Sequence, residues 1–214
     1  MLLSPRAKVK KLRNPSCKLC PLHEGKDNVC VMGDGLYKLP VFVVGEAPGY
    51  QEDKYGKPFV GQTGKLLRSE LLKVGLNPSS LYLTNVAKCF PEGTPSEEEA
   101  RICSNNYLRR EIEILNPAFI LALGQGAYRI LVPGEERIGK ARGQLQRGHN
   151  NQPVFVTWHP SYVLRNKREL PTFREDLAIF AAMLRLDFGY EIEEGLSTSP
   201  EATEFSESES PALA

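Results

Sequence analysis

Short aliphatic runs alternate along the chain with segments whose apolar residues recur at helical spacing. The aliphatic runs predict four buried strands, at residues 41–45, 81–86, 118–124 and 153–160. The periodic segments predict helices at residues 63–76, 96–115 and 174–186. Because short buried strands that alternate with helices form parallel sheets, the pattern predicts an α/β fold with helices on both faces of one sheet.

Three of the predicted strands run directly into a polar residue. Glu46 follows the first strand, Asn85 ends the second, and His159 ends the fourth. The carboxyl ends of parallel strands share one edge of the sheet, so these three side chains are expected to converge on one crevice. The third strand runs into GQG (124–126). We interpret this as a tight turn, because two glycines are too little for a dinucleotide fingerprint.

The loop after the first strand is unusually acidic. The segment VVGEAPGYQED (43–53) combines two glycines and a proline with three carboxylates, Glu46, Glu52 and Asp53. Loops at this edge of a parallel sheet are where α/β proteins place ligands. A ligand or a reaction that uses negative charge is therefore expected at this loop.

Charge is distributed unevenly along the chain. The formal net charge is +1, but residues 1–186 carry 27 basic and 18 acidic side chains, because the acidic excess is concentrated at the C-terminus. A basic body indicates a polyanionic partner, most commonly nucleic acid, and the alternative is an ordinary solvated surface.

The composition predicts one folded domain with an appendage. Residues 1–186 form the expected domain, with 1–16 as a basic N-terminal arm. The segment 187–214 is acidic, rich in Ser, Glu and Pro, and too poor in apolar residues to fold. This tail is expected to screen the basic face or bind an unidentified protein. No apolar run is long enough to span a membrane and no secretory signal is visible, so a cytoplasmic monomer is expected.

Five cysteines indicate a metal centre. Cys17 and Cys20 have the spacing that lets two sulfurs bind one centre, and Cys89 and Cys103 can complete a four-thiolate site. Zinc, the first choice on the residues alone, and an iron–sulfur cluster both suit such a site. The alternative is a redox-active CxxC beside two buried cysteines. Cys30, in the strand-like VCVM, is interpreted as a small core residue.

Several short motifs occur together in a fixed order. They are CKLC (17–20), GEAPGYQED (45–53), GKPFVGQTGKLL (56–67), LTNVAKC (83–89), the later Cys103, and WHPSYVLR (158–165). With these motifs in this order, most of the chain (about residues 17–186) resembles the family-4 uracil-DNA glycosylases. That family is the iron–sulfur branch of the uracil-DNA glycosylase superfamily. One difference from that family stands out, since FPEGTPSEEE (90–99) replaces its RPP-like stretch. The GEQPG loop and KRRIH insertion of another branch of the superfamily, which links covalently to its substrate DNA, are absent, so this trapping chemistry is not expected.

The resemblance implies a fold, a cofactor and an activity. The fold is a three-layer α/β/α sandwich on a four-stranded parallel sheet, and the cofactor is a 4Fe–4S cluster held by Cys17, Cys20, Cys89 and Cys103 in place of zinc. The activity is DNA repair: uracil is flipped out of single- or double-stranded DNA and its N-glycosidic bond is hydrolysed, which releases free uracil and leaves an abasic site. The alternative is a non-catalytic damage sensor or DNA-binding module with the same fold and cluster.

The resemblance also implies how the base is held. Phe59 is expected to stack on uracil, and Asn85 to read its edge, because one amide can accept from N3–H and donate to O4. His159 is expected to donate to O2, where negative charge gathers as the bond breaks. The small residues expected to close around the base are Gly45, Ala47, Pro48 and Gly49.

The three carboxylates of the acidic loop receive different expected roles. Glu46 is favoured to orient the attacking water and stabilise the sugar cation, and Asp53 is the second candidate for this catalytic role. Glu52 is expected to occupy the space that the 5-methyl group of thymine would need.

The WHPSYVLR segment is expected to contact DNA. Leu164, or Val163 beside it, would enter the gap left by the flipped nucleotide. Arg165, with Lys167 and Arg168, would contact phosphates, and Ser161 would bind a flanking phosphate.

Overall fold

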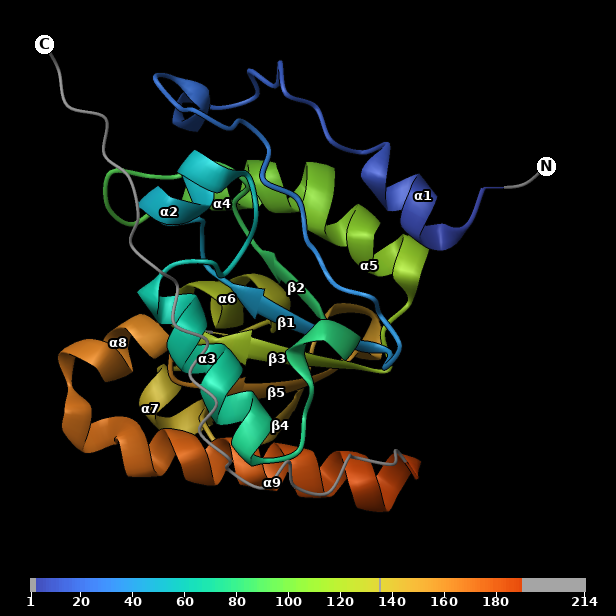
Figure 1. The fold of residues 1–214 in the computed structure, drawn as a ribbon, viewed down its shortest axis with the longest axis vertical. Coiled ribbons are helices and arrows are strands. Elements are labelled where there is room, and N and C mark those ends of the chain that lie inside the picture. Colours follow the sequence, from blue (N-terminus) through green and yellow to red (C-terminus); the bar gives the residue numbers. More distant parts are fainter. Residues whose placement is uncertain (1–2, 135, 190–214) are drawn as a thin grey trace, which may run out of the picture.

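The computed structural model describes residues 3–134 and 136–189, and its centre is a five-stranded sheet (Figure 1). In order across the sheet the strands are β2 (Tyr82–Asn85), β1 (Val41–Gly45), β3 (Phe119–Leu123), β5 (Pro153–Thr157) and β4 (Leu145–Arg147). The first four run parallel, as predicted, whereas β4 pairs antiparallel with β5. The expected four-stranded parallel sheet is thus corrected to a mixed, mostly parallel sheet of five strands. β4 was not predicted, because it is a short edge strand without an apolar run.

Helices cover both faces of the sheet, as the alternation of strands and helices predicts. One face is covered by α3 (Gln62–Lys73), α8 (Pro160–Arg165) and α9 (Leu170–Phe188). The other is covered by α1 (Pro5–Lys10), α4 (Glu97–Cys103), α5 (Arg109–Leu115), α6 (Gly124–Leu131) and α7 (Ile138–Ala141). The short helix α2 (Tyr50–Tyr55) follows the acidic loop. In Figure 1, α9 runs along the β4 end of the sheet and α5 lies beyond β2.

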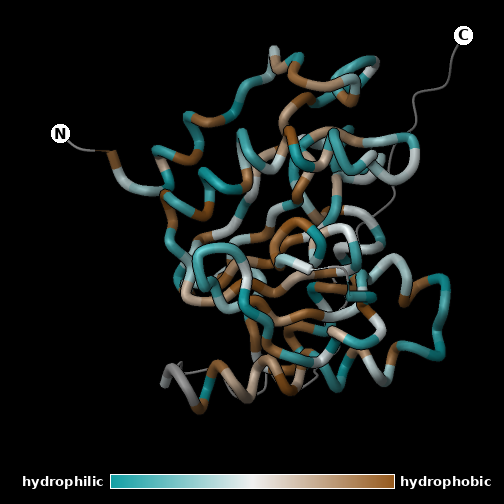
Figure 2. Tube along the Cα trace, turned by 180° about the vertical axis from the view of Figure 1, so that it is seen from behind, coloured by the Kyte–Doolittle hydropathy of each residue, from teal (hydrophilic) through white to brown (hydrophobic). Residues whose placement is uncertain are grey.

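The four parallel strands are buried on both faces, and alternate side chains enter two separate cores. Val41 and Val43 of β1 join the core under α3 and α9, whereas Phe42 and Val44 join the core under α5 and α6. This follows from the two-residue period of a strand. Figure 2 shows the hydrophobic segments gathered in the strands and the hydrophilic ones around them.

The predicted helix at 96–115 is one continuous element with a π segment in its middle. Ser96 caps α4 by a reciprocal pair of hydrogen bonds with Glu99, as the SEEE sequence indicates. A π turn, Ser104–Leu108, then joins α4 to α5. Such π bulges insert one extra residue into a helix and often occur at functional positions.

Other predicted elements shift at their ends or disappear. The last helix begins at Leu170, before the predicted start at 174, and the helix predicted at 63–76 ends at Lys73. The VCVM segment is not a strand, because Cys30 has left-handed backbone dihedrals (φ 61°). Short 3₁₀ turns occur at Pro21–His23, Pro78–Ser80, His149–Asn151 and Lys167–Glu169.

The predicted N-terminal arm packs against the rest of the domain. The N-terminal arm contains α1, which packs on α5 and buries Val9. Most of the predicted acidic tail, residues 190–214, lies outside the described residues.

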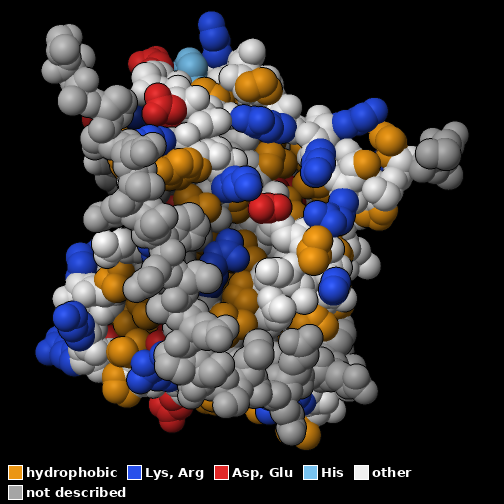
Figure 3. Space-filling model, viewed as in Figure 1, with side chains coloured by type: hydrophobic (Ala, Val, Ile, Leu, Met, Phe, Trp, Pro, Cys, Tyr) orange, Lys and Arg blue, Asp and Glu red, His pale blue; other side chains and the backbone are white. Residues whose placement is uncertain are grey.

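In the described part of the chain, every helix is too short or too polar to cross a membrane. Figure 3 shows many Lys and Arg side chains on one face of the molecule.

Candidate active site

A cavity of about 210 Å³ opens at the carboxyl ends of β1, β2 and β5. It brings together Glu46, Asn85 and His159, which confirms the predicted convergence of the three strand ends. Its wall also includes most of the other residues predicted to hold the base. Those predicted residues are Ala47, Pro48, Gly49, Glu52 and Phe59. The other residues of the wall are Thr63, Phe90, Pro91, Gly93 and Ser161.

Three residues predicted to hold the base, Phe59, Asn85 and His159, all lie close to Gly45. A Cβ atom added at Gly45 would lie 2.5 Å from Asn85 Oδ1, 2.8 Å from Phe59 Cζ and 3.5 Å from His159 Nε2. Because the first two distances are shorter than any ordinary carbon contact, only glycine lets these groups approach so closely. The last residue of β1 therefore sets the spacing of the cavity.

Phe59 is held in a strained conformation. Its backbone is left-handed (φ 55°), which is costly for a residue with a bulky side chain. The neighbouring chain fixes this geometry: a Cβ at Gly64 would lie 2.0 Å from the Phe59 carbonyl oxygen, and Arg68 Nε donates to the same oxygen at 3.3 Å. The result is a ring whose edge faces Gly45 at the cavity wall.

Asn85 is buried, with 2% of its surface exposed, and its side-chain amide has no hydrogen-bond partner among the described residues. Its backbone carbonyl, by contrast, accepts a hydrogen bond from Lys88 Nζ at 2.7 Å. The main chain is thus fixed while the amide remains available to a ligand in the cavity.

The imidazole of His159 is oriented by Ser161. The backbone N–H of Ser161 donates to His159 Nδ1 (3.2 Å), and the Ser161 hydroxyl lies 2.7 Å from the same nitrogen. Since Nδ1 accepts, the proton of the neutral ring is on Nε2, the atom that faces Gly45. Burial, with a contribution from Arg165, lowers the pKa of His159 to about 4, so the ring is neutral near pH 7.

Glu46 lies at the cavity with its carboxylate against α6. A Cβ at Gly126 would lie 2.0 Å from Glu46 Oε1, so the side chain fits only over a glycine. No described residue forms a hydrogen bond or ion pair with the carboxylate, and burial raises the pKa of Glu46 above its ordinary value. The carboxylate is therefore available to water or ligand.

The other two carboxylates of the loop are already engaged with the backbone. Glu52 lines the cavity, and its two oxygens accept from the N–H groups of Gly49 (3.0 Å) and Gly61 (2.8 Å). Asp53 is absent from the described cavity wall, because its oxygens accept from the N–H groups of Asp27 (3.1 Å) and Asn28 (3.2 Å). The geometry separates Asp53 from the catalytic position considered for it.

The WHPSYVLR segment follows β5 directly and forms the helix α8, with His159 as its N-cap. Leu164 is 38% exposed whereas Val163 is buried, so of the two only Leu164 can reach a partner. Arg165 lines a second hollow beside the cavity, together with Glu46, Arg129 and Ser161. The hydroxyl of Ser161, predicted to bind a phosphate, is directed at His159 instead.

The four cysteines predicted to bind a metal centre line one hollow. Cys17, Cys20, Cys89 and Cys103 are free thiols, and Lys88 N–H donates to Cys103 Sγ at 3.2 Å. Cys30 is 1% exposed, as expected of a core residue, and lines the same hollow. Within the described ranges, no three His, Cys, Asp or Glu side chains are grouped as ligands of a single metal ion.

A buried ion pair between the cavity and this hollow was not predicted from the sequence. Lys88 Nζ donates to Glu111 Oε2 and Thr84 Oγ1, both at 2.6 Å, and the Lys88 and Glu111 side chains are at most 1% exposed. Tyr82 OH donates to Glu111 Oε1 at 2.8 Å. We call these four residues the Lys88–Glu111 network.

Two glycines of the GQG segment also shape the site, a role that was not predicted. GQG begins α6 instead of forming only a turn, and Gly126 leaves room for the Glu46 carboxylate. At Gly124 (φ 85°) a Cβ would lie 2.7 Å from His159 Cβ. The signal in the sequence was the pair of glycines at the end of a strand whose neighbours end in polar residues.

Comparisons with known proteins identify the family of this chain. The model of the uracil DNA glycosylase superfamily matches residues 32–183. The type-4 uracil-DNA glycosylase of Thermotoga maritima is 42% identical over 158 residues, which cover 72% of this chain and 81% of the relative. That of Pyrobaculum aerophilum is 38% identical over 174 residues, 77% of this chain and 88% of the relative.

A type-5 uracil-DNA glycosylase of Pyrobaculum aerophilum is more distant, at 30% identity over 139 residues, 56% of this chain and 61% of the relative. The family match spans all five strands and every residue of the cavity, and the similarity to type-4 proteins extends over most of each chain. The chain therefore belongs to the uracil DNA glycosylase superfamily, and within it to the type-4 uracil-DNA glycosylases.

Proposed function

We propose that this protein removes uracil from DNA in repair, hydrolysing the bond between the base and its deoxyribose. One observation carries the proposal: a ring, an amide and a neutral imidazole from three separate segments converge on Gly45. A flat base with a hydrogen-bonding edge matches such a set of groups. The base reaches it only when flipped out of the DNA stack.

Recognition of uracil rests on Phe59 and Asn85 in this proposal. The Phe59 ring stacks on the base, and the Asn85 amide accepts from N3–H and donates to O4. Cytosine presents the opposite donor and acceptor pattern at these two positions. Because Asn85 is buried and has no described partner, binding cytosine would leave polar groups unsatisfied, which is the penalty that makes such sites selective.

His159 stabilises the uracil anion as the bond breaks. Its Nε2–H donates to O2, where negative charge increases in the transition state. A neutral donor suits this role: because the low pKa of His159 keeps the ring uncharged, its Nε2–H is a weak acid that donates a hydrogen bond and keeps its proton. Ser161 acts as a positioning residue by fixing the tautomer.

Glu46 acts on the sugar side of the bond. As the base departs, the deoxyribose gains oxocarbenium character, and an ionised carboxylate favours this cation and orients the attacking water. Glu46 is chosen over Asp53 because its carboxylate is available at the cavity. Glu52, held by Gly49 and Gly61, forms the rigid wall against the 5-methyl group of thymine.

Contacts with DNA follow from α8. Leu164 is the exposed apolar side chain that fills the gap left by the flipped nucleotide, and Arg165 contacts a phosphate beside the cavity. The basic surface of the domain supports binding to single- or double-stranded DNA, and affinity should fall steeply with salt.

Cys17, Cys20, Cys89 and Cys103 are proposed to hold a 4Fe–4S cluster. The donor set fits: four free thiols from two distant parts of the chain line one hollow, and a backbone N–H already donates to one sulfur. When bound, the cluster supplies rigid attachment of the N-terminal segment to the domain. Iron and acid-labile sulfide should be present in protein purified without oxygen, lost in Cys89→Ser and retained in Cys30→Ser.

The experiment for the activity is uracil release from a single-stranded oligonucleotide that contains one deoxyuridine. Anaerobically purified protein should release uracil and leave a matched thymine oligonucleotide intact. Protein that carries its iron and binds the oligonucleotide, yet releases no uracil, would refute the glycosylase proposal and favour a damage sensor. Release of thymine at a similar rate would refute the role given to Glu52.

A further inference from the structure

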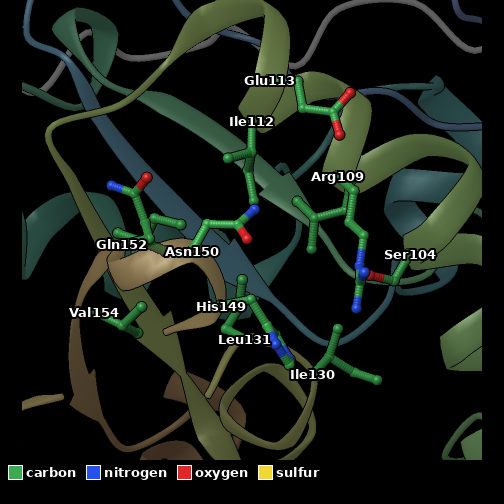
Figure 4. A pocket seen from close by; sticks show the side chains of 12 residues that line it. Ser104, Arg109, Ile112, Glu113, Ile130, Leu131, His149, Asn150, Gln152 and Val154 are labelled. Atoms are coloured by element: carbon green, nitrogen blue, oxygen red, sulfur yellow. The ribbon is translucent and has the colours of Figure 1, made fainter. Parts of the chain in front are cut away.

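A separate hollow, of about 160 Å³, lies between the π segment, α6 and the turn at His149–Asn151 (Figure 4). It is distinct from the active site. Its floor includes Ile120 and Val154, each the second residue of its strand, whereas the cavity around Gly45 is at the opposite, carboxyl ends of the strands. None of the roles proposed above uses this hollow.

The hollow contains a buried polar atom without a partner. Ser104 is 2% exposed, and its hydroxyl makes no hydrogen bond to any described residue. Buried hydroxyls normally have a partner, because leaving one unsatisfied costs about 1–3 kcal/mol. Ser104 is also the first residue of the π segment, and its side chain points into the hollow in Figure 4. The local structure thus leaves this donor at the hollow without a partner among the described residues.

Cationic and donor side chains surround Ser104. Figure 4 shows Arg109 extending toward Ser104 from the helix and His149 entering from the facing turn. Neither side chain has a hydrogen bond or ion pair with another described residue. In the facing turn, Asn150 (φ 59°) and Asn151 (φ 60°) are both left-handed, a conformation that asparagine adopts more readily than most residues.

An adjacent polar hollow of about 200 Å³ shares Ser104, Arg109 and His149 with the first. It adds Arg101 and Arg129, so three guanidinium groups border the combined space. Arg101 already pairs with Glu97 on the surface. Among the described residues that line the two hollows, Glu113 is the one carboxylate.

We propose that the combined space binds a small phosphomonoester with a flat apolar body, such as a nucleoside monophosphate. The phosphate is held by Arg109 and the Ser104 hydroxyl from the helical element and by His149 from the facing turn. The body packs on the apolar part of the hollow, formed by Leu108, Ile112, Ile120, Leu131 and Val154. A bare anion would leave the apolar part of the hollow unfilled, and an apolar ligand would leave the guanidinium and hydroxyl groups unused.

The test is calorimetric titration with adenosine monophosphate, whose base does not match the Asn85 pattern proposed for uracil. It should bind once per protein chain, inorganic phosphate should bind more weakly, and adenosine should not bind. Arg109→Gln and His149→Gln should each weaken binding about tenfold or more, because each removes a charge-assisted or imidazole hydrogen bond. Arg110→Gln, at an exposed neighbouring position outside the hollow, is the matched control.

Ser104→Ala separates binding from folding. Since the hydroxyl has no partner within the described chain, this variant should unfold at the same temperature as the parent or higher, yet bind adenosine monophosphate more weakly. A clear loss of thermal stability in Ser104→Ala would overturn the reading of Ser104 as a ligand donor.

Three further outcomes would overturn the proposal. They are the absence of binding, unchanged binding in both Arg109→Gln and His149→Gln, and displacement of the nucleotide by free uracil, which would place it in the active site. If Arg109→Gln weakens oligonucleotide binding while adenosine monophosphate does not bind, the hollow holds a DNA backbone phosphate instead. Uracil release is measured separately, so failure of the glycosylase proposal leaves this test intact.

Discussion

The base cavity and the Lys88–Glu111 network both use polar residues of β2, yet they treat hydrogen bonding in opposite ways. In the network every side chain is paired: Lys88, Thr84, Tyr82 and Glu111 satisfy one another while fully or almost fully buried. In the cavity, the Asn85 amide has no described partner although it is only three residues from Lys88.

This difference distinguishes polar groups that stabilise the fold from polar groups that are available to a ligand. A saturated buried network fixes the backbone, because every change in it leaves a charge or a donor unsatisfied. A cavity group without a partner contributes little to folding and keeps its hydrogen-bonding capacity for a ligand. The two are linked, since Lys88 donates to the Asn85 carbonyl and so holds the residue whose amide faces the cavity.

The largest effect on activity is expected for Glu46→Gln. Loss of the carboxylate should lower kcat for uracil release by about 10²–10⁴-fold, the usual contribution of acid–base groups, with thermal stability unchanged or raised. Asp53→Asn is the matched control, because the Asp53 carboxylate serves the backbone of Asp27 and Asn28. Single-turnover assays compare the two; a greater loss in Asp53→Asn would reassign the catalytic carboxylate.

Lys88→Met should have the largest effect on folding. It leaves the Glu111 carboxylate buried without its cation, which typically costs about 3–5 kcal/mol of unfolding free energy. Chemical denaturation measures the loss, and the double variant Lys88→Met/Glu111→Leu should recover part of it. Arg101→Met, which breaks the exposed pair with Glu97, should cost less than about 1 kcal/mol. Equal losses in both single variants would contradict the distinction between paired core and surface.

His159→Leu should lower kcat more than it changes KM, because the donor acts on charge that forms in the transition state. Removal of one such donor typically lowers the rate by about 10²–10³-fold. Steady-state kinetics on the deoxyuridine oligonucleotide separates the two constants. A rise in KM with unchanged kcat would mean that His159 only binds the ground state.

The pH dependence of kcat/KM should reflect Glu46 on the acid side. Glu46 must be ionised to act, and burial raises its pKa, so activity should begin to fall at a higher pH than for an exposed glutamate. The fall should approach tenfold per pH unit below that pKa and be absent from the residual activity of Glu46→Gln. His159, with a pKa of about 4, stays neutral through this range. A second transition near the ordinary histidine pKa would show that His159 ionises in the free enzyme.

The smallest effect is expected for Ser161→Ala. Loss of one hydroxyl contact to His159 Nδ1 should cost about 1 kcal/mol, roughly a fivefold decrease in kcat, since the Ser161 backbone N–H still orients the ring. If Ser161 mainly bound a DNA phosphate, the decrease would appear in oligonucleotide affinity and in its salt dependence instead.

The sequence by itself determined the parallel part of the sheet and the edge at which the site would form. Aliphatic runs fixed four strands, and polar residues at three strand ends located the cavity, because residue spacing and strand direction follow from local geometry. It also supplied the cysteine set and the family motifs. It did not supply β4, whose three residues carry no apolar pattern and pair only because β5 lies beside them.

Tertiary structure alone decided which of the similar side chains are available for chemistry. Glu46, Glu52 and Asp53 are indistinguishable as carboxylates in one acidic loop, and only folding ties Glu52 to Gly61 and Asp53 to Asp27 while leaving Glu46 free. It likewise paired Lys88 with Glu111, 23 residues away. The physical reason is that a pattern along the chain reports which face a residue occupies, whereas hydrogen-bond partners and burial depend on segments distant in sequence.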